Sequence, residues 1–269
     1  YTALKALTAG DYRVVHVTDA TRGGLFAWRS GDQSTNITND TLEGEWVPPS
    51  SDATGASGAW QRILDRKGRY EADWFDIADD GTDAGADIQA AIDYLQTLSG
   101  GGELWLNYAE YGTDSQISIT KPHIRLMGRG HTGGIFHQAD DSLEGSGIKW
   151  IGSATSDAIV QVRTPDTGLE ADPKVHDAAI LGLYIDGNGL ADYCLYLSTI
   201  SYCEFDVLTQ NALVANTFCD TNANTPFGGP PDAQHNIFHR LGIVCTESGT
   251  PNSSAITANG LVLDSDPTG

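Results

Sequence analysis

Apolar and polar positions alternate with two different periods along this chain. Between residues 84 and 98, four apolar side chains recur at i, i+3, i+4 and i+7, the spacing of one helix face: Ile88, Ala91, Ile92 and Leu95. Asp83 or a neighbour is expected to cap the start of this helix, and the glycines at 100–102 are expected to end it. After residue 130 no helical stripe occurs, and short segments separated by turn residues predict strands.

The strand-like segments beyond residue 180 repeat. One set consists of residues 183–185, 205–207 and 241–243, and a second consists of 195–197, 213–215 and 261–263. The first set predicts that Leu183 lies beside Phe205. A Gly/Pro/Asn-rich segment at 220–234 lengthens the last interval of both sets. A period of about 20 residues with insertions confined to turns is typical of a stacked solenoid, in which neighbouring coils complete each other's core.

Residues 1–70 have a different pattern and predict a small strand-rich adaptor domain. Two strands are expected, at 12–17 and 25–28. The polar residues 29–44 are expected to form a loop, and residues 48–58 a second loop that ends at 59–63. Large aromatic rings supply much buried area per residue, so three tryptophans are expected in the core of this domain: Trp28, Trp46 and Trp60.

The charge of the chain excludes some functions. Among its 269 residues, 36 are acidic and 15 are basic, which gives a formal net charge of −21. A nucleic-acid-binding protein needs a basic surface, so no nucleic-acid partner is expected. The chain has no apolar run of 18 residues, so no membrane insertion is expected either. The acidity favours solubility in an extracellular medium, with tuning of the approach to a charged glycan as the alternative.

The cysteines are expected to be reduced thiols in the core. Four are present, at spacings of 9, 16 and 26 residues: Cys194, Cys203, Cys219 and Cys245. These spacings match neither a zinc pattern nor a Cys-x-x-Cys redox motif. All four lie among apolar strand segments, where a free cysteine behaves as a small buried hydrophobe. This arrangement is typical of a protein that folds in a bacterial cytoplasm before release.

Residues 74–130 contain a series of short motifs: Trp74-Phe75, Asp80-Gly81-Thr82-Asp83, an Ile-Gln-x-Ala-Ile run at 88–92, a Gly-Gly strand at 101–104 and a strand with Gly-x-Gly at 124–130. Together they resemble the opening of the pectate-lyase-superfamily β-helix found in phage tailspikes. The chain departs from the family pattern at Asp76-Ile77, where Gly-Ala is common, and at Ala84, where a second Asp is common. Both departures concern a cap and a turn, and they leave the expected fold unchanged.

The resemblance implies an all-β fold: a right-handed parallel β-helix with one short helix at its start, preceded by the adaptor. It divides the chain into an adaptor at 1–70 and the first coils at 71–269, with further coils expected beyond residue 269. It also implies a homotrimeric virion spike, assembled in the bacterial cytoplasm and then extracellular. The adaptor would bind tail, baseplate or capsid proteins, and the spike would recognise a bacterial surface polysaccharide, by binding alone or with cleavage by a hydrolase or lyase. The alternative is a secreted, pectate-lyase-like enzyme with no virion.

Four residues form the candidate site for a glycan. Glycoside hydrolysis usually needs two carboxyl groups, and Asp186, Glu204 and Asp206 are the predicted catalytic residues. Tyr184 is the predicted substrate-binding residue. Because side chains alternate along a strand, all four are expected to face outward, with Tyr184 beside Asp206. The alternative is an ordinary solvated face of an acidic protein.

No metal or cofactor site is expected. The segment Asp186-Gly187-Asn188-Gly189 suits a tight turn. His235 and His239 have the i, i+4 spacing of a helical metal pair, but the surrounding residues predict a strand, which would split the pair between two faces. The chain has neither a Gly-x-Ser-x-Gly elbow nor a phosphate-binding glycine loop, so serine-nucleophile and nucleotide chemistry are not expected.

Overall fold

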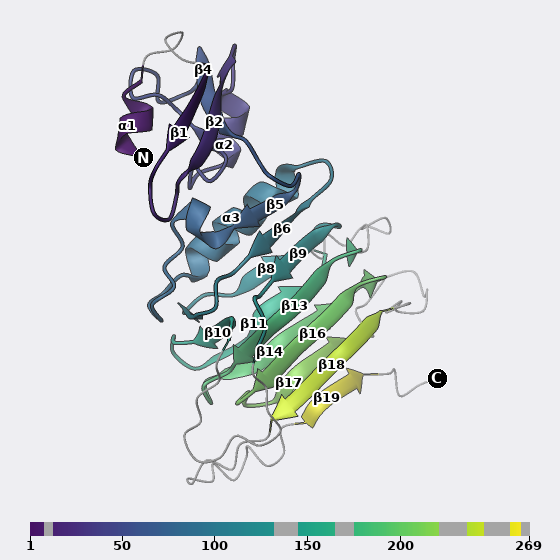
Figure 1. Cartoon of the computed structure of the whole chain (residues 1–269). Coiled ribbons are helices and arrows are strands. Elements are labelled where there is room, and N and C mark those ends of the chain that lie inside the picture. The colour runs from purple at the N-terminus through teal and green to yellow at the C-terminus, as the bar shows by residue number, and fades with distance from the viewer. Residues whose placement is uncertain (8–12, 132–144, 165–174, 221–235, 245–258, 265–269) are drawn as a thin grey trace.

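The computed structural model is mostly β, with few and short helices (Figure 1). It describes residues 1–7, 13–131, 145–164, 175–220, 236–244 and 259–264. Within these ranges no helix has both the length and the apolar character needed to cross a membrane.

The N-terminal part forms a four-stranded antiparallel sheet with the order β1-β2-β4-β3. Its strands are β1 (Val14–Val17), β2 (Gly24–Ser30), β3 (Trp46–Val47) and β4 (Gly58–Arg62), and its helices are α1 (Thr2–Lys5) and α2 (Ser34–Asn39). The two predicted strands are therefore confirmed as β1 and β2. The prediction of a loop over 29–44 is wrong where α2 forms. None of the α2 residues is buried. The helix therefore has no apolar stripe from which the sequence could predict it.

The three tryptophans of this part divide between two cores. Trp60 is fully buried, and its ring centre lies 5.2 Å from that of Trp28 in an edge-to-face arrangement. Trp46 instead packs against the core of the parallel sheets that follow. The expectation of a single tryptophan core is therefore correct for Trp28 and Trp60 and wrong for Trp46.

From residue 69 onward, strand pairing is parallel, and each return of the chain adds a layer to the stack. The first sheet contains β5 (Arg69–Glu71), β6 (Gly102–Trp105), β9 (Ile124–Met127), β13 (Ala179–Asp186), β16 (Glu204–Gln210) and β18 (Ile237–Val244). β10 (Gly147–Trp150) also pairs with β13, and β7 (Glu110–Thr113) pairs with β10. The second contains β8 (Ile117–Ile119), β11 (Thr155–Val162), β14 (Ala191–Ser198), β17 (Ala215–Asp220) and β19 (Asn259–Asp264). A short pair joins β12 (Val175–His176) to β15 (Ile200–Ser201). Figure 1 shows the layers following one another away from the N-terminal sheet.

The predicted helix is α3 (Gly85–Thr97), at the N-terminal end of the stack, preceded by the 3-10 helix η1 (Ala72–Phe75). All four residues of the predicted apolar stripe are fully buried. The carboxylate of Asp83 accepts a hydrogen bond of 3.1 Å from the backbone N–H of Gly85, although the N-cap position itself is Ala84. α3 therefore covers the first layer of the core with its apolar face.

The first predicted alignment identifies three neighbouring strands correctly, β13, β16 and β18. It pairs Leu183 with the wrong residue of β16. Leu183 pairs with Val207, which pairs in turn with Leu241, whereas Phe205 pairs with Ile180. Gly182, with φ of 68°, is the extra residue of an irregularity between Leu181 and Leu183. A shift of two residues leaves every side chain on the same face, so the apolar pattern could not detect it.

The second predicted alignment is correct at its two ends. Leu195 and Leu261 lie in one row, but the residue between them is Thr217 rather than Leu213. Thr217 is fully buried, and its hydroxyl lies 3.2 Å from that of Thr209 in the adjoining sheet. A hydroxyl pair therefore fills a core position at which an apolar residue was expected.

The prediction of reduced, buried thiols is confirmed for three cysteines: Cys194, Cys203 and Cys219. Cys245 lies outside the described residues. Burial raises the pKa of Cys203 and of Cys219 to about 11, so these thiols stay protonated and unreactive.

Arg62 joins the N-terminal sheet to the parallel stack. It is 3% exposed, and its guanidinium donates hydrogen bonds to the carbonyls of Arg22, Gly23 and Gly44 at 3.0, 2.6 and 2.8 Å. Its Cζ atom lies 4.5 Å from the ring centre of Trp74, the first residue of the segment that leads to α3. The buried charge is thus satisfied by fixed dipoles and an aromatic face.

A buried carboxylate forms a second connection between the two parts. Glu45 is 5% exposed, and its Oε2 atom accepts hydrogen bonds from the hydroxyls of Tyr70 and Tyr94 at 2.5 and 2.6 Å. Its Oε1 atom accepts a bond of 2.6 Å from the Gln61 side chain. Burial, followed by the nearby Glu45 charge, raises the pKa of both tyrosines, so both remain hydrogen-bond donors.

We expect Tyr94→Phe to lower the free energy of unfolding by about 1–3 kcal/mol, because it removes a donor from a buried carboxylate. Urea denaturation followed by fluorescence measures this change. Tyr108→Phe is the matched control, since Tyr108 is 55% exposed and should change stability by less than about 0.5 kcal/mol. Equal stabilities of the two variants would contradict a structural role for the Glu45 network.

Candidate functional site

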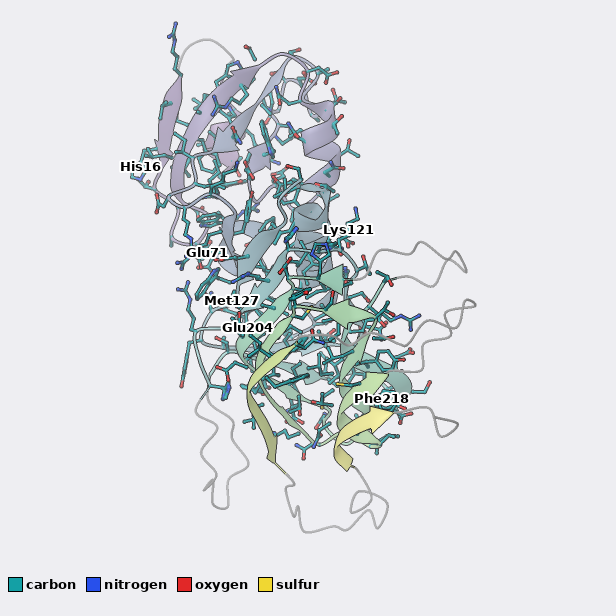
Figure 2. All side chains as sticks on the ribbon, turned by 90° about the vertical axis from the view of Figure 1, so that its right-hand side faces the viewer. His16, Glu71, Lys121, Met127, Glu204 and Phe218 are labelled. Carbon is teal, nitrogen blue, oxygen red and sulfur yellow. The ribbon has the colours of Figure 1, made fainter. Side chains whose placement is uncertain are left out.

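Strand register places two rows of side chains on one outer face of the first sheet. One row contains Glu71, Trp105, Met127, Leu181 and Asp206, and the other contains Arg69, Glu103, Arg125, Ala179 and Glu204. The residues between the two rows point into the core: Tyr70, Leu104, Leu126, Ile180 and Phe205. Neighbouring strands lie about 4.8 Å apart, so the rows extend across five layers. We call these ten residues the outer face, in which only Ala179 is buried. Figure 2 shows Glu71, Met127 and Glu204 along one side of the molecule.

Arginines flank an aromatic ring at the N-terminal end of the outer face. The Cζ atom of Arg69 lies 4.3 Å from the ring centre of Trp105, and that of Arg129 lies 5.4 Å from it. Both arginines also bind Glu71, at 2.9 Å from Arg69 Nε and 2.5 Å from Arg129 Nη2. The indole N–H of Trp105 donates to Glu103 at 3.1 Å. These contacts hold the ring and the guanidinium groups in place.

Two carboxylates lie at the other end of the outer face. Glu204 and Asp206 are partly exposed and are neighbours on the same side of β16, so their Cα atoms are about 6.6 Å apart at a rise of about 3.3 Å per residue. The Oδ1 atom of Asp206 lies 4.0 Å from Nε2 of His131, a largely buried side chain. The structure therefore brings two of the three predicted catalytic carboxylates together.

Asp186 does not lie with that pair. It shares a rung with Gln210, whereas Asp206 is paired with Leu181, so Asp186 lies about 13 Å along the strand. It is 7% exposed rather than facing solvent. Its carboxylate accepts three hydrogen bonds, from the Asn188 backbone at 2.8 Å and from the Gln210 and Asn211 side chains, both at 2.9 Å. Asp186 thus holds the predicted turn at 186–189, in which Asn188 is left-handed with φ of 52°.

Tyr184 is also buried, contrary to the expectation of an exposed ring. It is 1% exposed, and its hydroxyl donates to Glu110 at 3.0 Å. Its ring occupies the space beside Gly147, where a Cβ atom would lie 1.9 Å from the ring. The neighbouring strand therefore covers Tyr184, which pairs with Gly147 rather than lying beside Asp206. In this arrangement its ring is not available for stacking on a sugar.

Only one histidine of the pair at 235 and 239 lies within the described residues. His235 lies outside the described residues. His239 lies in strand β18, which confirms that this segment is not helical.

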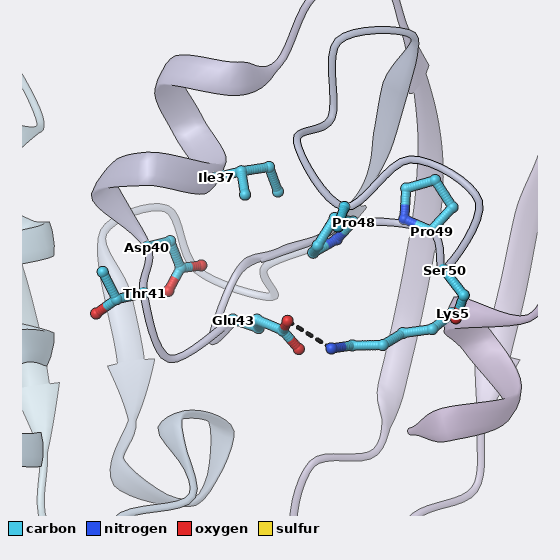
Figure 3. Close-up of a pocket in the computed structure, with 9 residues that line it drawn as sticks. Lys5, Ile37, Asp40, Thr41, Glu43, Pro48, Pro49 and Ser50 are labelled. Atoms are coloured by element: carbon cyan, nitrogen blue, oxygen red, sulfur yellow. Dashed lines mark hydrogen bonds and ion pairs between the residues drawn. The ribbon is translucent and has the colours of Figure 1, made fainter.

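A pocket of about 250 Å³ lies in the N-terminal part (Figure 3). It is lined by Lys5, Ile37, Asp40, Thr41, Glu43, Pro48, Pro49, Ser50 and Ala53. An ion pair of 2.5 Å between Lys5 and Glu43 crosses it. Asp40 accepts hydrogen bonds from three consecutive backbone N–H groups of residues 44–46, and burial raises its pKa to about 6 despite them. Asp40 thus shapes the 40–46 loop, and Lys5 and Glu43 are engaged with each other.

The sequence did not single out Trp105, Arg69 or Arg129 as site residues. Arg69 and Trp105 occupy alternating positions of short strands, which marks them as outward-facing once the inward residues are known. Arg129 follows β9 and reaches Trp105 from the adjacent layer. The alternation of buried and exposed positions can therefore identify Arg69 and Trp105 from the sequence. The position of Arg129 beside Trp105 can be found only when the strand pairing is known.

Comparisons with solved structures give distant similarities. A tailspike protein of Acinetobacter baumannii bacteriophage Fri1, a capsular polysaccharide depolymerase, is 12% identical with a TM-score of 0.41 over 96% of this chain and 56% of its own. The tailspike protein of Acinetobacter baumannii phage AM24 is 13% identical with a TM-score of 0.36 over 93% and 58%. The A-module of a mannuronan C-5 epimerase from Azotobacter vinelandii is 17% identical with a TM-score of 0.34 over 55% and 49%.

This chain therefore spans 49–58% of the lengths of these three proteins. All three scores are low, so the similarity establishes neither a shared activity nor a shared substrate. No protein-family model matches the chain, and no curated protein matches it.

We expect Asp186→Ala to lower the free energy of unfolding by about 1–3 kcal/mol, because it leaves the buried amide of Gln210 without its acceptor. Thermal or urea unfolding measures the loss. Asp65→Ala is the matched control, since Asp65 is exposed and its removal should be nearly neutral. If Asp186→Ala is as stable as that control, the structural role assigned to Asp186 is wrong.

Proposed function

We propose that this chain belongs to a virion spike that recognises a bacterial surface polysaccharide on its outer face. In this proposal the parallel stack is the opening of a right-handed parallel β-helix, and the spike is a homotrimer. The N-terminal sheet binds the particle, and the spike is extracellular once assembled. The tailspike-like motif at 74–130 supports the choice of a spike, and two of its residues, Trp74 and Phe75, lie at the junction of the two parts.

The contact of Trp105 with two guanidinium groups carries the proposal of glycan binding. Sugars present apolar C–H faces and polar rims, which an indole ring and charged hydrogen-bond donors complement. Arg69 and Arg129 already face Trp105, so little side-chain ordering is left for the binding step. The layers repeat at about 4.8 Å, which suits a repeating polymer lying along the stack.

Glu204 and Asp206 support a cleavage step on the same face. A glycosidase needs one carboxyl group as acid and a second as base or nucleophile. Both side chains project from the same side of β16, so their carboxyl groups can face one bound glycan. In the proposed reaction one of the pair protonates the leaving oxygen while the other activates water.

Glycan binding is tested by co-sedimentation of the full-length protein with surface polysaccharide from candidate hosts. We expect Trp105→Ala to reduce the retained fraction at least tenfold, because it removes both the ring and the platform for the arginines. Tyr108→Ala removes an exposed aromatic ring outside the two rows and should leave binding unchanged. Thermal unfolding of both variants separates lost binding from lost folding. Equal retention by both variants, or no retention from any host, would overturn the proposal.

Cleavage is tested separately, by following reducing-end release and the absorbance of unsaturated uronates. We expect Glu204→Gln and Asp206→Asn each to slow chain shortening by at least 100-fold while leaving retention intact, because each removes one ionisable group and keeps its shape. Asp65→Asn is the control. An unsaturation signal would identify a lyase and contradict the hydrolytic pair. A glycan that is retained but stays intact would limit the function to adsorption.

A further inference from the structure

The turn that leads into the first sheet uses a left-handed residue in four successive layers. These residues are Gly101, His123, Asp177 and Tyr202, with φ of 62°, 63°, 55° and 54°. Strand register aligns them in one row, because the residues two positions later, at 103, 125, 179 and 204, pair with one another. Aspartate and histidine tolerate this conformation better than most side chains. The backbone therefore sets the directions in which His123 and Asp177 project.

Three metal-ligating side chains meet at this row. Asp177 Oδ2 lies 2.8 Å from His176 Nδ1 and 3.7 Å from His123 Nδ1. One ligand atom from each of the three residues lies within 4.8 Å of the other two. The two imidazole rings meet edge to face, with centres 5.0 Å apart. All three side chains are 42–51% exposed, so an ion can reach them from solvent.

We propose that His123, His176 and Asp177 bind one divalent transition-metal ion, with Zn²⁺ as the best match. Tetrahedral zinc has ligand bonds of about 2.0–2.2 Å, which places its ligand atoms about 3.4 Å apart. The distances of 2.8 and 3.7 Å around Asp177 bracket this value, so small side-chain rotations complete the site. Two imidazoles favour zinc, nickel or copper over calcium or magnesium, which prefer oxygen ligands. Water takes the fourth position.

The ion connects two layers that are distant in sequence. His123 precedes β9, whereas His176 and Asp177 precede β13, and positions 123 and 176 are 53 residues apart. The unfolded chain does not hold these ligands together, so binding stabilises the folded stack. A net charge of −21 also raises the local concentration of cations. Residue spacing within single segments predicts no metal site here, because these three side chains come together only when the strand layers stack.

The site is tested by titrating the metal-free full chain with Zn²⁺ in a calorimeter. We expect one ion per chain at this site and at least tenfold weaker binding in His123→Gly and His176→Gln. His123→Gly should fold well, because Gly101 already occupies the equivalent turn position. His16→Gln is the matched control, since His16 is exposed on β1 and lies outside the cluster. Ca²⁺ should give no saturable heat.

Co²⁺ substitution provides a readout that a purely structural turn would not affect. Bound Co²⁺ should show the intense visible absorption of a four-coordinate site, and this absorption should disappear in His123→Gly and His176→Gln but persist in His16→Gln. Unchanged Zn²⁺ affinity in both cluster variants, or no saturable binding to the unaltered chain, would overturn the proposal. The result is independent of glycan binding, because the outer-face residues are unchanged in these variants.

Discussion

Parallel backbone hydrogen bonding between successive layers is the constraint on which the rest of this structure depends. It fixes which side chains lie beside one another and sets their separation at about 4.8 Å. Trp105 and Asp206 are about 100 residues apart in the sequence, yet they belong to one row of the outer face. The same constraint brings His123 next to Asp177. The residues of the outer face and those of the His123–Asp177 cluster come together only when the layers stack.

The first layer depends on its contacts with α3 and the N-terminal sheet. An unpaired strand edge and an open core end are costly to expose, and here α3 covers the apolar end with its stripe of isoleucine, alanine and leucine. Arg62 and Glu45 then attach the N-terminal sheet through buried, fully hydrogen-bonded charges. Replacing either partner of such a network leaves a buried charge unsatisfied, so these contacts favour one arrangement of the two parts.

Much of the fold could be predicted from local patterns. The spacing of Ile88, Ile92 and their neighbours determined α3, and period-two alternation located most strands, because both signals depend on residues close in sequence. The short helix α2 was missed because it buries nothing. The register was missed between Leu183 and Phe205 because a two-residue shift preserves the facing of every side chain.

The candidate site was less predictable for the same reason. Outward alternation correctly brought Glu204 and Asp206 together, but exposure also depends on the neighbouring layer. Gly147 leaves room for the Tyr184 ring, and amide side chains cover Asp186, so both residues are buried. The arginines around Trp105 come from different layers and could be found only after the pairing was known.

Hydroxyl-radical footprinting with and without bound polysaccharide tests the role of the outer face most directly. Tryptophan and methionine oxidise readily, and both Trp105 and Met127, the single methionine of the chain, lie on this face. We predict that bound glycan slows oxidation of Trp105 and Met127 severalfold and leaves the exposed Tyr108 unchanged. Unchanged oxidation of Trp105 and Met127 while glycan is bound would contradict the account and place recognition elsewhere on the protein.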